Sequence, residues 1–187
     1  MDKININNLR GKCLAAMPSL EGQFARSLIF VCSHSSEGAM GFVVNKPFPN
    51  MSFSELTFNL PFVSKSGEII PLYQGGPMER DKGFVLHDDS LIYDDTFLAG
   101  EGVCITSSPQ ILQDISTQRG PKRCMIVLGY AGWTSGQLEA EIAQNMWMVT
   151  SLPPQWLFAD EAADKWAYAL ASLGVEKASL SLPLGHS

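Results

Sequence analysis

The sequence lacks the motifs of the common cofactor and metal chemistries. It has no Gly-Lys-Ser/Thr segment, which excludes a P-loop, and none of its four cysteines forms a CxxC pair. Its three histidines, His34, His87 and His186, have no metal-ligand spacing with one another. We therefore expect neither a cofactor nor a bound metal, and no motif defines a set of catalytic residues.

Long hydrophobic runs are also missing. No apolar stretch reaches the roughly 18 residues that a membrane span needs. The first ten residues, MDKININNLR, lack the apolar segment and the small-residue cleavage site of a signal peptide. These two absences predict a cytoplasmic protein that makes no contact with a membrane.

Positive charge is scarce. Thirteen Lys and Arg against nineteen Asp and Glu give a net charge of -6, and the densest basic cluster is the loose trio Arg119, Lys122 and Arg123. Non-specific binding of nucleic acid depends mainly on neutralising phosphates. The sequence also lacks the two adjacent amphipathic helices of a helix-turn-helix. Direct DNA binding by a transcriptional regulator is therefore the least favoured function.

The chain does contain enough apolar side chains for one core. Its 187 residues are 45% hydrophobic and include ten phenylalanines, which excludes a disordered regulator. This length is long for one domain and short for two, and the sequence shows no repeat or linker. We expect one domain over residues 1–187 and a monomeric protein.

Hydrophobic periodicity predicts a mixed α/β (α+β) sandwich with about eight to ten short strands and four or more helices in irregular alternation. Strands are expected at residues 13–17, 27–32, 42–44, 68–73, 83–87, 91–93, 103–106, 124–128 and 147–150. Helices are expected at residues 52–60, 109–118, 138–146 and 166–173.

Three local signals support these assignments. The apolar run at 27–32 is typical of a strand covered on both faces, and we expect it to pair with 42–44 across a longer loop. Ser52 and Glu55 match a capping box at the start of a helix. Ser108 is expected to cap the next helix through its hydroxyl.

The centre of the chain is predicted to be a strand, a glycine turn and a helix, over residues 123–147. Gly129, Gly132 and Gly136 do not have the G-x-G-x-x-G spacing of a dinucleotide site. Thr134 or Ser135 is expected to cap the helix, whose free N–H groups attract anions. The simpler interpretation, that these glycines only permit a tight connection, is favoured.

Reactive side chains offer an alternative function. Each cysteine lies in or beside a strand-like apolar run, which is typical of buried thiols in a reducing compartment. Cys32 and His34, two residues apart on a strand, are expected to point to the same side. A small-molecule enzyme acting through Cys32 and His34, or through His87, is therefore the alternative to a non-catalytic protein.

Several segments together resemble the YqgE/AlgH family, a bacterial family without an assigned biochemical activity. The matching segments are Ala16-Met17-Pro18, Phe24 with Arg26-Ser27, Gly38-Ala39-Met40-Gly41, Asn45-Lys46-Pro47, Tyr73-x-Gly75-Gly76-Pro77, Gly83-Phe84-Val85-Leu86-His87, Leu128-Gly129-Tyr130-Ala131-Gly132-Trp133, Gly136-Gln137-Leu138-Glu139, Trp166 and Gly185-His186. The resemblance implies a cytoplasmic α/β protein of one domain, with regulatory roles for some members, and it supplies no catalytic residues.

The favoured hypothesis is a binding or regulatory module that uses a shallow cleft of glycine and aromatic residues to hold an unknown protein or small-molecule partner. Its expected lining is Met40, Gly41, Asn45, Gly75, Gly76, Tyr130, Gly132 and Trp133. Trp133 is expected to be partly exposed and to border the Gly75–Gly76 turn.

Overall fold

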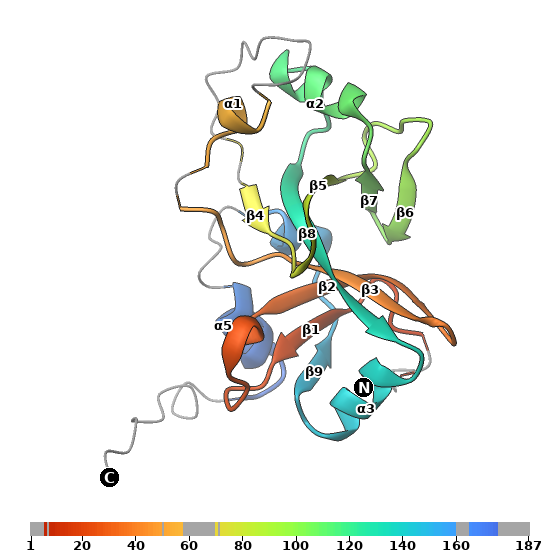
Figure 1. Ribbon diagram of the computed structural model, residues 1–187, viewed down its shortest axis with the longest axis vertical. Coiled ribbons are helices and arrows are strands. Elements are labelled where there is room, and N and C mark those ends of the chain that lie inside the picture. The colour runs from red at the N-terminus through yellow and green to blue at the C-terminus, as the bar shows by residue number, and fades with distance from the viewer. Residues whose placement is uncertain are drawn as a thin grey trace.

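The computed structural model describes residues 6, 8–49, 51–57, 70, 72–159 and 165–175 (Figure 1). The strands in these ranges are β1 (Cys13–Ala16), β2 (Leu28–Ser35), β3 (Gly38–Val43), β4 (Leu72–Gln74), β5 (Met78–His87), β6 (Phe97–Gly100), β7 (Val103–Thr106), β8 (Cys124–Thr134) and β9 (Trp147–Thr150). The helices are α1 (Phe53–Leu56), α2 (Pro109–Ser116), α3 (Gln137–Ala143), α4 (Pro154–Leu157) and α5 (Lys165–Ser172), with a 3-10 turn η1 (Gly22–Phe24). The predicted mixed α+β fold is confirmed.

Strand β8 is the element around which the sheet is built. The strand order is β6-β7-β5-β8-β3-β2-β1-β9, and β4 pairs with β8 off this path. One edge of β8 pairs antiparallel with β5, and the other pairs first with β4, in parallel, and then antiparallel with β3. Figure 1 shows β8 running from the α2 side of the molecule to the α3 side, so it joins the two halves of the sheet.

The predicted glycine turn after residue 128 is wrong, because β8 continues to Thr134. Gly129 has a φ of 72°, and a Cβ there would lie 2.6 Å from the Gly76 carbonyl oxygen. The glycine therefore permits a close backbone approach inside the strand rather than a turn. Helix α3 is preceded by Gly136, without a side-chain cap, so the expected cap at Thr134 or Ser135 is also wrong.

The β2–β3 hairpin is tighter than expected. The antiparallel pair is confirmed, but pairing reaches Ser35 and Gly38, so only residues 36 and 37 remain as a turn in place of the expected longer loop. Main-chain pairing continues here despite the polar side chains, because these residues lie at an exposed end of the sheet.

The four predicted helices begin within one residue of the observed starts, whereas α4 was not predicted as a helix. Besides the cap of α3, one further cap differs from its prediction. Ser52 and Glu55 form the capping box in full. At α2, the Ser108 hydroxyl makes no cap; instead, the Asp95 carboxylate accepts from the Ser107 and Ser108 amides at 2.9 and 2.8 Å.

One predicted strand is absent, and two other predicted elements are described only in part. Residues 91–93 form no strand. Of the strand expected at 68–73, the described part is β4 together with residue 70, which lies outside any element. Residues 58–60 of the helix predicted at 52–60 fall outside the described ranges.

Apolar side chains pack on both faces of the sheet. Leu28 and Phe30 of β2 join one cluster with Trp166 of α5, whereas Ile29 faces a second cluster with Trp147 of β9. All the apolar residues of β2 are buried, as its uninterrupted apolar run predicts. Within the ranges that the structure describes, no helix is long and apolar enough to cross a membrane.

Candidate functional site

The structure brings the eight residues of the predicted cleft together only in part. Met40 lies opposite Gly132 where β3 pairs with β8. Gly41 and Gly75 are buried, and a Cβ on Gly75 would lie 2.3 Å from the Gly129 carbonyl oxygen. These two buried glycines serve close contact between chain segments, and neither lines a pocket described below.

Two further members of the predicted cleft are engaged in hydrogen bonds. The Asn45 side chain accepts from the Leu28 amide at 2.8 Å and donates to the Arg26 carbonyl oxygen at 2.8 Å. It therefore fastens the chain after β3 to the chain before β2. The Tyr130 hydroxyl donates to the Glu79 carboxylate at 3.1 Å, which holds the half-exposed ring against β5.

The prediction that Trp133 is partly exposed is wrong, since only 7% of the residue is accessible. Because β8 continues past Gly132, the indole turns inward and meets Leu138 of α3 and, edge to face at 6.3 Å, Trp147. Its Nε1 donates to Glu141 Oε2 at 2.8 Å. Trp133 is a core residue of the β8–α3 junction.

Cys32 and His34 do not form a catalytic pair. The β2–β3 register shifts between Val31 and Ser33, so Cys32 is an extra residue that interrupts the alternation of side chains. Cys32 faces the cluster of Phe30, whereas His34 lies opposite Ala39 on the other face. Burial raises the pKa of the Cys32 thiol to about 12, which disfavours the nucleophilic thiolate.

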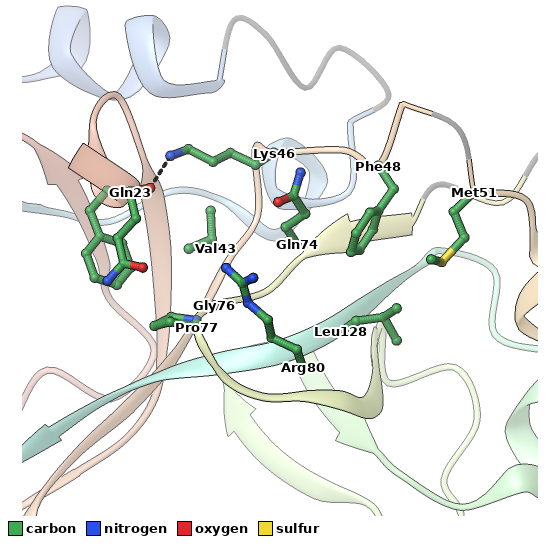
Figure 2. Close-up of a pocket in the computed structure, with 11 residues that line it drawn as sticks. Gln23, Val43, Lys46, Phe48, Met51, Gln74, Gly76, Pro77, Arg80 and Leu128 are labelled. Atoms are coloured by element: carbon green, nitrogen blue, oxygen red, sulfur yellow. Dashed lines mark hydrogen bonds between the residues drawn. The ribbon is translucent and has the colours of Figure 1, made fainter. Parts of the chain in front are cut away.

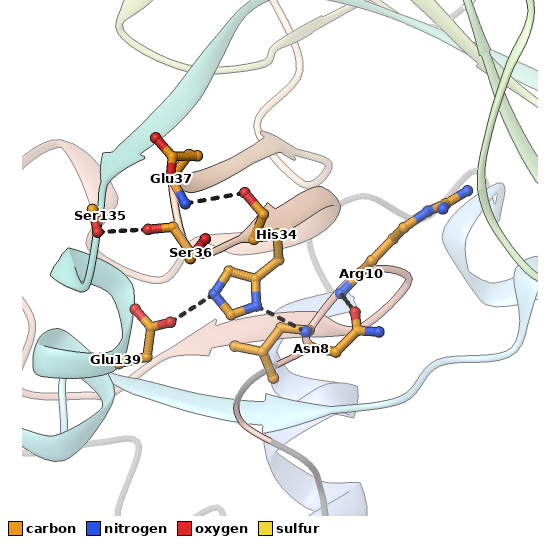
Figure 3. Close-up of polar contacts among 9 residues, drawn as sticks. Asn8, Arg10, His34, Ser36, Glu37, Ser135 and Glu139 are labelled. Atoms are coloured by element: carbon orange, nitrogen blue, oxygen red, sulfur yellow. Dashed lines mark hydrogen bonds and ion pairs between the residues drawn. The ribbon is translucent and has the colours of Figure 1, made fainter.

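His34 holds the N-terminal segment to α3 (Figure 3). Its side chain is 1% accessible, and Nδ1 accepts from the Leu9 amide at 3.0 Å. Nε2 therefore carries the proton and donates to Glu139 Oε1 at 2.9 Å. Both ring nitrogens are occupied, which leaves neither for a substrate.

His87 is equally occupied. It is fully buried, and burial lowers its pKa, so the neutral ring is favoured. Nδ1 donates to the Asp88 carbonyl oxygen at 2.7 Å, and Nε2 accepts from the Thr106 hydroxyl at 2.9 Å. Thr96 continues this chain through its hydroxyl contact with Thr106 at 2.7 Å. The network joins β5, β7 and the chain before β6.

An open pocket of about 380 Å³ lies where β3, β4 and β5 meet the η1 turn (Figure 2). Its lining is Gln23, Phe24, Val43, Lys46, Phe48, Met51, Gln74, Gly76, Pro77, Arg80 and Leu128. Gly76 is the single residue that it shares with the predicted cleft.

Main-chain hydrogen bonds build one wall of this pocket. The Gln74 amide donates to the Lys46 carbonyl oxygen, and the Phe48 amide donates to the Leu72 carbonyl oxygen, both at 2.8 Å. The segment after β3 is thereby held along β4. The side chains of Lys46, Phe48 and Gln74 come from these paired segments and are drawn around one space in Figure 2.

Glycines shape the opposite wall. The β5–β8 register shifts between Met78 and Gly83, so the first half of β5 departs from regular pairing. A Cβ on Gly129 would lie 3.3 Å from the Arg80 Cα, and one on Gly76 would lie 2.1 Å from the Tyr130 carbonyl carbon. Because both positions lack a side chain, β5 can lie close to β8 and carry Arg80 over the pocket.

The pocket has a cationic part and an apolar part. In Figure 2 the guanidinium of Arg80 lies near Val43 and the ammonium of Lys46 points to the Gln23 carbonyl oxygen, while Phe48, Met51 and Leu128 lie toward the other end of the pocket. Lys46 Nζ donates to the Gln23 carbonyl oxygen, and desolvation lowers the pKa of the Lys46 ammonium.

No described carboxylate lies within ion-pair distance of Lys46 or Arg80. The described residues also contain no group of three His, Cys, Asp or Glu side chains able to hold a metal. The pocket therefore offers positive charge without a neutralising side chain from the described chain.

Sequence reasoning missed every residue that lines this pocket except Gly76. Lys46, Gln74 and Arg80 are distant along the chain, and no spacing connects them with Gln23 or Phe48. The usable signal was local: Lys46 precedes a proline shortly after β3, and Gln74 directly precedes Gly75-Gly76, as expected where chain segments lie close together.

The fold and pocket define a mixed α+β protein with a strongly paired central strand and an open cationic pocket. Residues 13–178 match the family described as AlgH-like. A UPF0301 protein from Nitrobacter hamburgensis is 41% identical over 189 residues, covering 96% of this chain and 88% of the relative. One from Methylobacterium nodulans is 39% identical, covering 96% and 90%. The chain belongs to the AlgH-like family.

Solved structures agree with this assignment. The solution structure of the AlgH protein from Pseudomonas aeruginosa matches with a TM-score of 0.78 and 33% identity over 100% of both chains. The crystal structure of a protein from Corynebacterium diphtheriae has a TM-score of 0.72 at 21% identity, covering 92% of this chain and 90% of that one, and it shares the fold.

Proposed function

We propose that this protein is a non-catalytic binding module with a regulatory role, and that its pocket between η1, β3, β4 and β5 receives an anionic ligand with an apolar part. The observation that carries the proposal is the pairing of Lys46 with Arg80 in one pocket, without a described carboxylate to neutralise either. The proposed ligand site thus includes Gly76 but not the buried Trp133.

The state of Lys46 favours an anion. Its ammonium is partly removed from water, as the lowered pKa indicates, and its described hydrogen-bond partner is a neutral carbonyl oxygen. An anion in the pocket would stabilise the charged form and reverse that shift. Hydrogen bonds to charged groups contribute roughly 1.5–3 kcal/mol each, so two such contacts would contribute roughly 3–6 kcal/mol, and the apolar part of the ligand would supply the rest.

The alternative functions have less support. For an enzyme, Cys32 is held as a thiol, and both nitrogens of His34 and His87 are used within the fold. For a DNA-binding regulator, the net charge of -6 opposes contact with a phosphate backbone. A regulatory role through a bound small molecule requires neither a catalytic side chain nor a basic surface.

Cellular setting and assembly form part of the same proposal. No disulfide joins the four cysteines, and three of them are buried, an arrangement that suits the reducing cytoplasm. We propose that the protein is a monomer in that compartment.

A ligand screen tests the proposal. Saturation-transfer NMR would compare small carboxylates and phosphates with neutral analogues, using the wild type and the Lys46→Gln/Arg80→Gln double variant. Anionic hits are expected to bind the wild type and to be lost in the double variant. The double variant Lys12→Gln/Lys82→Gln is the matched control, since it removes the same charge outside the pocket. Hits that survive the loss of both pocket cations, or the absence of anionic hits, would overturn the proposal.

A further inference from the structure

The lining and the size of the pocket indicate a class of ligand, and this inference rests on the proposed function. We propose that the ligand is a nucleoside monophosphate, whose phosphate lies between Lys46 and Arg80 and whose base lies against Phe48, with its edge facing the Gln74 amide. Three properties of the lining point to this class: the number of cations, the position of the amide and the size of the space.

The two cations match a phosphate monoester. Such a group carries about -1.5 to -2 charges at pH 7, so it can be neutralised by two cations, whereas a single carboxylate leaves one of them unmatched. Arg80 supplies a planar fork suited to phosphate oxygens, and Lys46 supplies a compact charge. Because no described acid competes for either side chain, both are available to the same ligand.

The other end of the pocket suits a flat ring with polar edges. Phe48, Met51 and Leu128 provide aromatic and apolar surface. The Gln74 side chain lies between this surface and the cations in Figure 2. An acyl chain in this place would bury the Gln74 amide without a hydrogen-bond partner, which is unfavourable. A base can accept and donate at its edge, as adenine does toward the amide of Asn or Gln.

The size of the pocket fits a mononucleotide. Its volume of about 380 Å³ lies near the lower end of the roughly 300–1,000 Å³ that is usual for small-molecule sites. The net charge of the chain, -6, disfavours a longer polyanion that would extend past the pocket.

Isothermal titration at pH 7.5 tests this inference with AMP, GMP, CMP and UMP, and with adenosine, ribose 5-phosphate and inorganic phosphate as partial ligands. At least one nucleotide is expected to saturate the wild type, with a Kd at least tenfold lower than those of its nucleoside and of ribose 5-phosphate. Arg80→Gln and Lys46→Gln should each raise that Kd about tenfold or more. Lys82→Gln, on the same strand but outside the pocket, should leave it unchanged.

The base contact has its own test. Gln74→Ala should reduce the difference in Kd among the four nucleotides while leaving the affinity for ribose 5-phosphate within twofold. Thermal unfolding of each variant, within about 3 °C of the wild type, shows that a lost affinity does not reflect a lost fold.

The outcomes separate this inference from the proposed function. If ribose 5-phosphate binds as tightly as every nucleotide, the base has no role and the inference is wrong. If no nucleotide binds but another anion does so through Lys46 and Arg80, the inference fails while the proposed function stands. If no anion binds, both fail.

Discussion

Replacing Trp133 by alanine should destabilise the protein strongly. The indole is buried between Leu138 and Trp147 and gives its N–H to Glu141. Truncating a buried aromatic side chain typically costs about 3–5 kcal/mol. The edge-to-face contact with Trp147 accounts for about 0.5–1.5 kcal/mol of the loss. For a chain of this length, such a change lowers Tm by roughly 6–20 °C.

Urea unfolding followed by circular dichroism provides the measurement. Trp156→Ala is the matched control, because Trp156 is 37% exposed and stacks on Tyr168 at the surface. That variant should lose about 1 kcal/mol, well below the loss at Trp133. A loss below about 1 kcal/mol in Trp133→Ala would refute the buried placement and restore the exposed cleft expected from sequence.

Three further outcomes follow from the structure. Cys32 should resist alkylation by iodoacetamide at pH 8 until the protein unfolds, because burial raises the pKa of its thiol to about 12. Peptide mass spectrometry would measure the labelling, and labelling of Cys32 within minutes in native buffer would contradict this. Because the pKa of His87 is lowered in the folded protein, the unfolded chain takes up the proton first, and stability should fall as the pH drops below about 6.5. The variant His87→Gln should be less stable at pH 7.5 but should lose less Tm between pH 7.5 and 5.5. Equal losses of Tm in the two proteins would show that His87 does not titrate on unfolding. Gly76→Ala should lower the free energy of unfolding in urea by about 1–3 kcal/mol, because its Cβ would lie 2.1 Å from the Tyr130 carbonyl carbon. The control Gly83→Ala should change this free energy little, since its Cβ would lie 3.5 Å from its nearest neighbour. Equal losses in the two variants would contradict the close approach at Gly76.

Short-range chemistry predicted much of the fold. The apolar run of β2 indicated a strand buried on both faces, and Ser52 with Glu55 indicated a helix start, because each signal depends on neighbouring residues only. The family resemblance, confirmed by the comparisons, rests on the same kind of local segment.

Errors arose where tertiary contacts decided the conformation. Gly129 suggested a turn, but the close approach of β5 makes it a strand residue with positive φ. The bulge at Cys32 reversed the expected alternation and sent His34 to the opposite face. Neither effect is visible without the partner strand.

The pocket was beyond sequence reasoning for a related reason. Gln23, Lys46, Gln74 and Arg80 converge because the segment after β3 is held along β4, while β5 lies close to β8 at Gly76. The predicted cleft shares only Gly76 with this pocket, and its other residues include the buried Gly41, Gly75 and Trp133.

The affinity of this pocket for anions is tested most directly by NMR titrations of the ¹⁵N-labelled protein with AMP, GMP, CMP and UMP. Saturable shifts are expected at the amides of Gln74, Gly76 and Arg80, and they should be lost in Lys46→Gln/Arg80→Gln. Shifts confined to residues outside the pocket, or shifts that persist in the double variant, would contradict an anion site between Lys46 and Arg80.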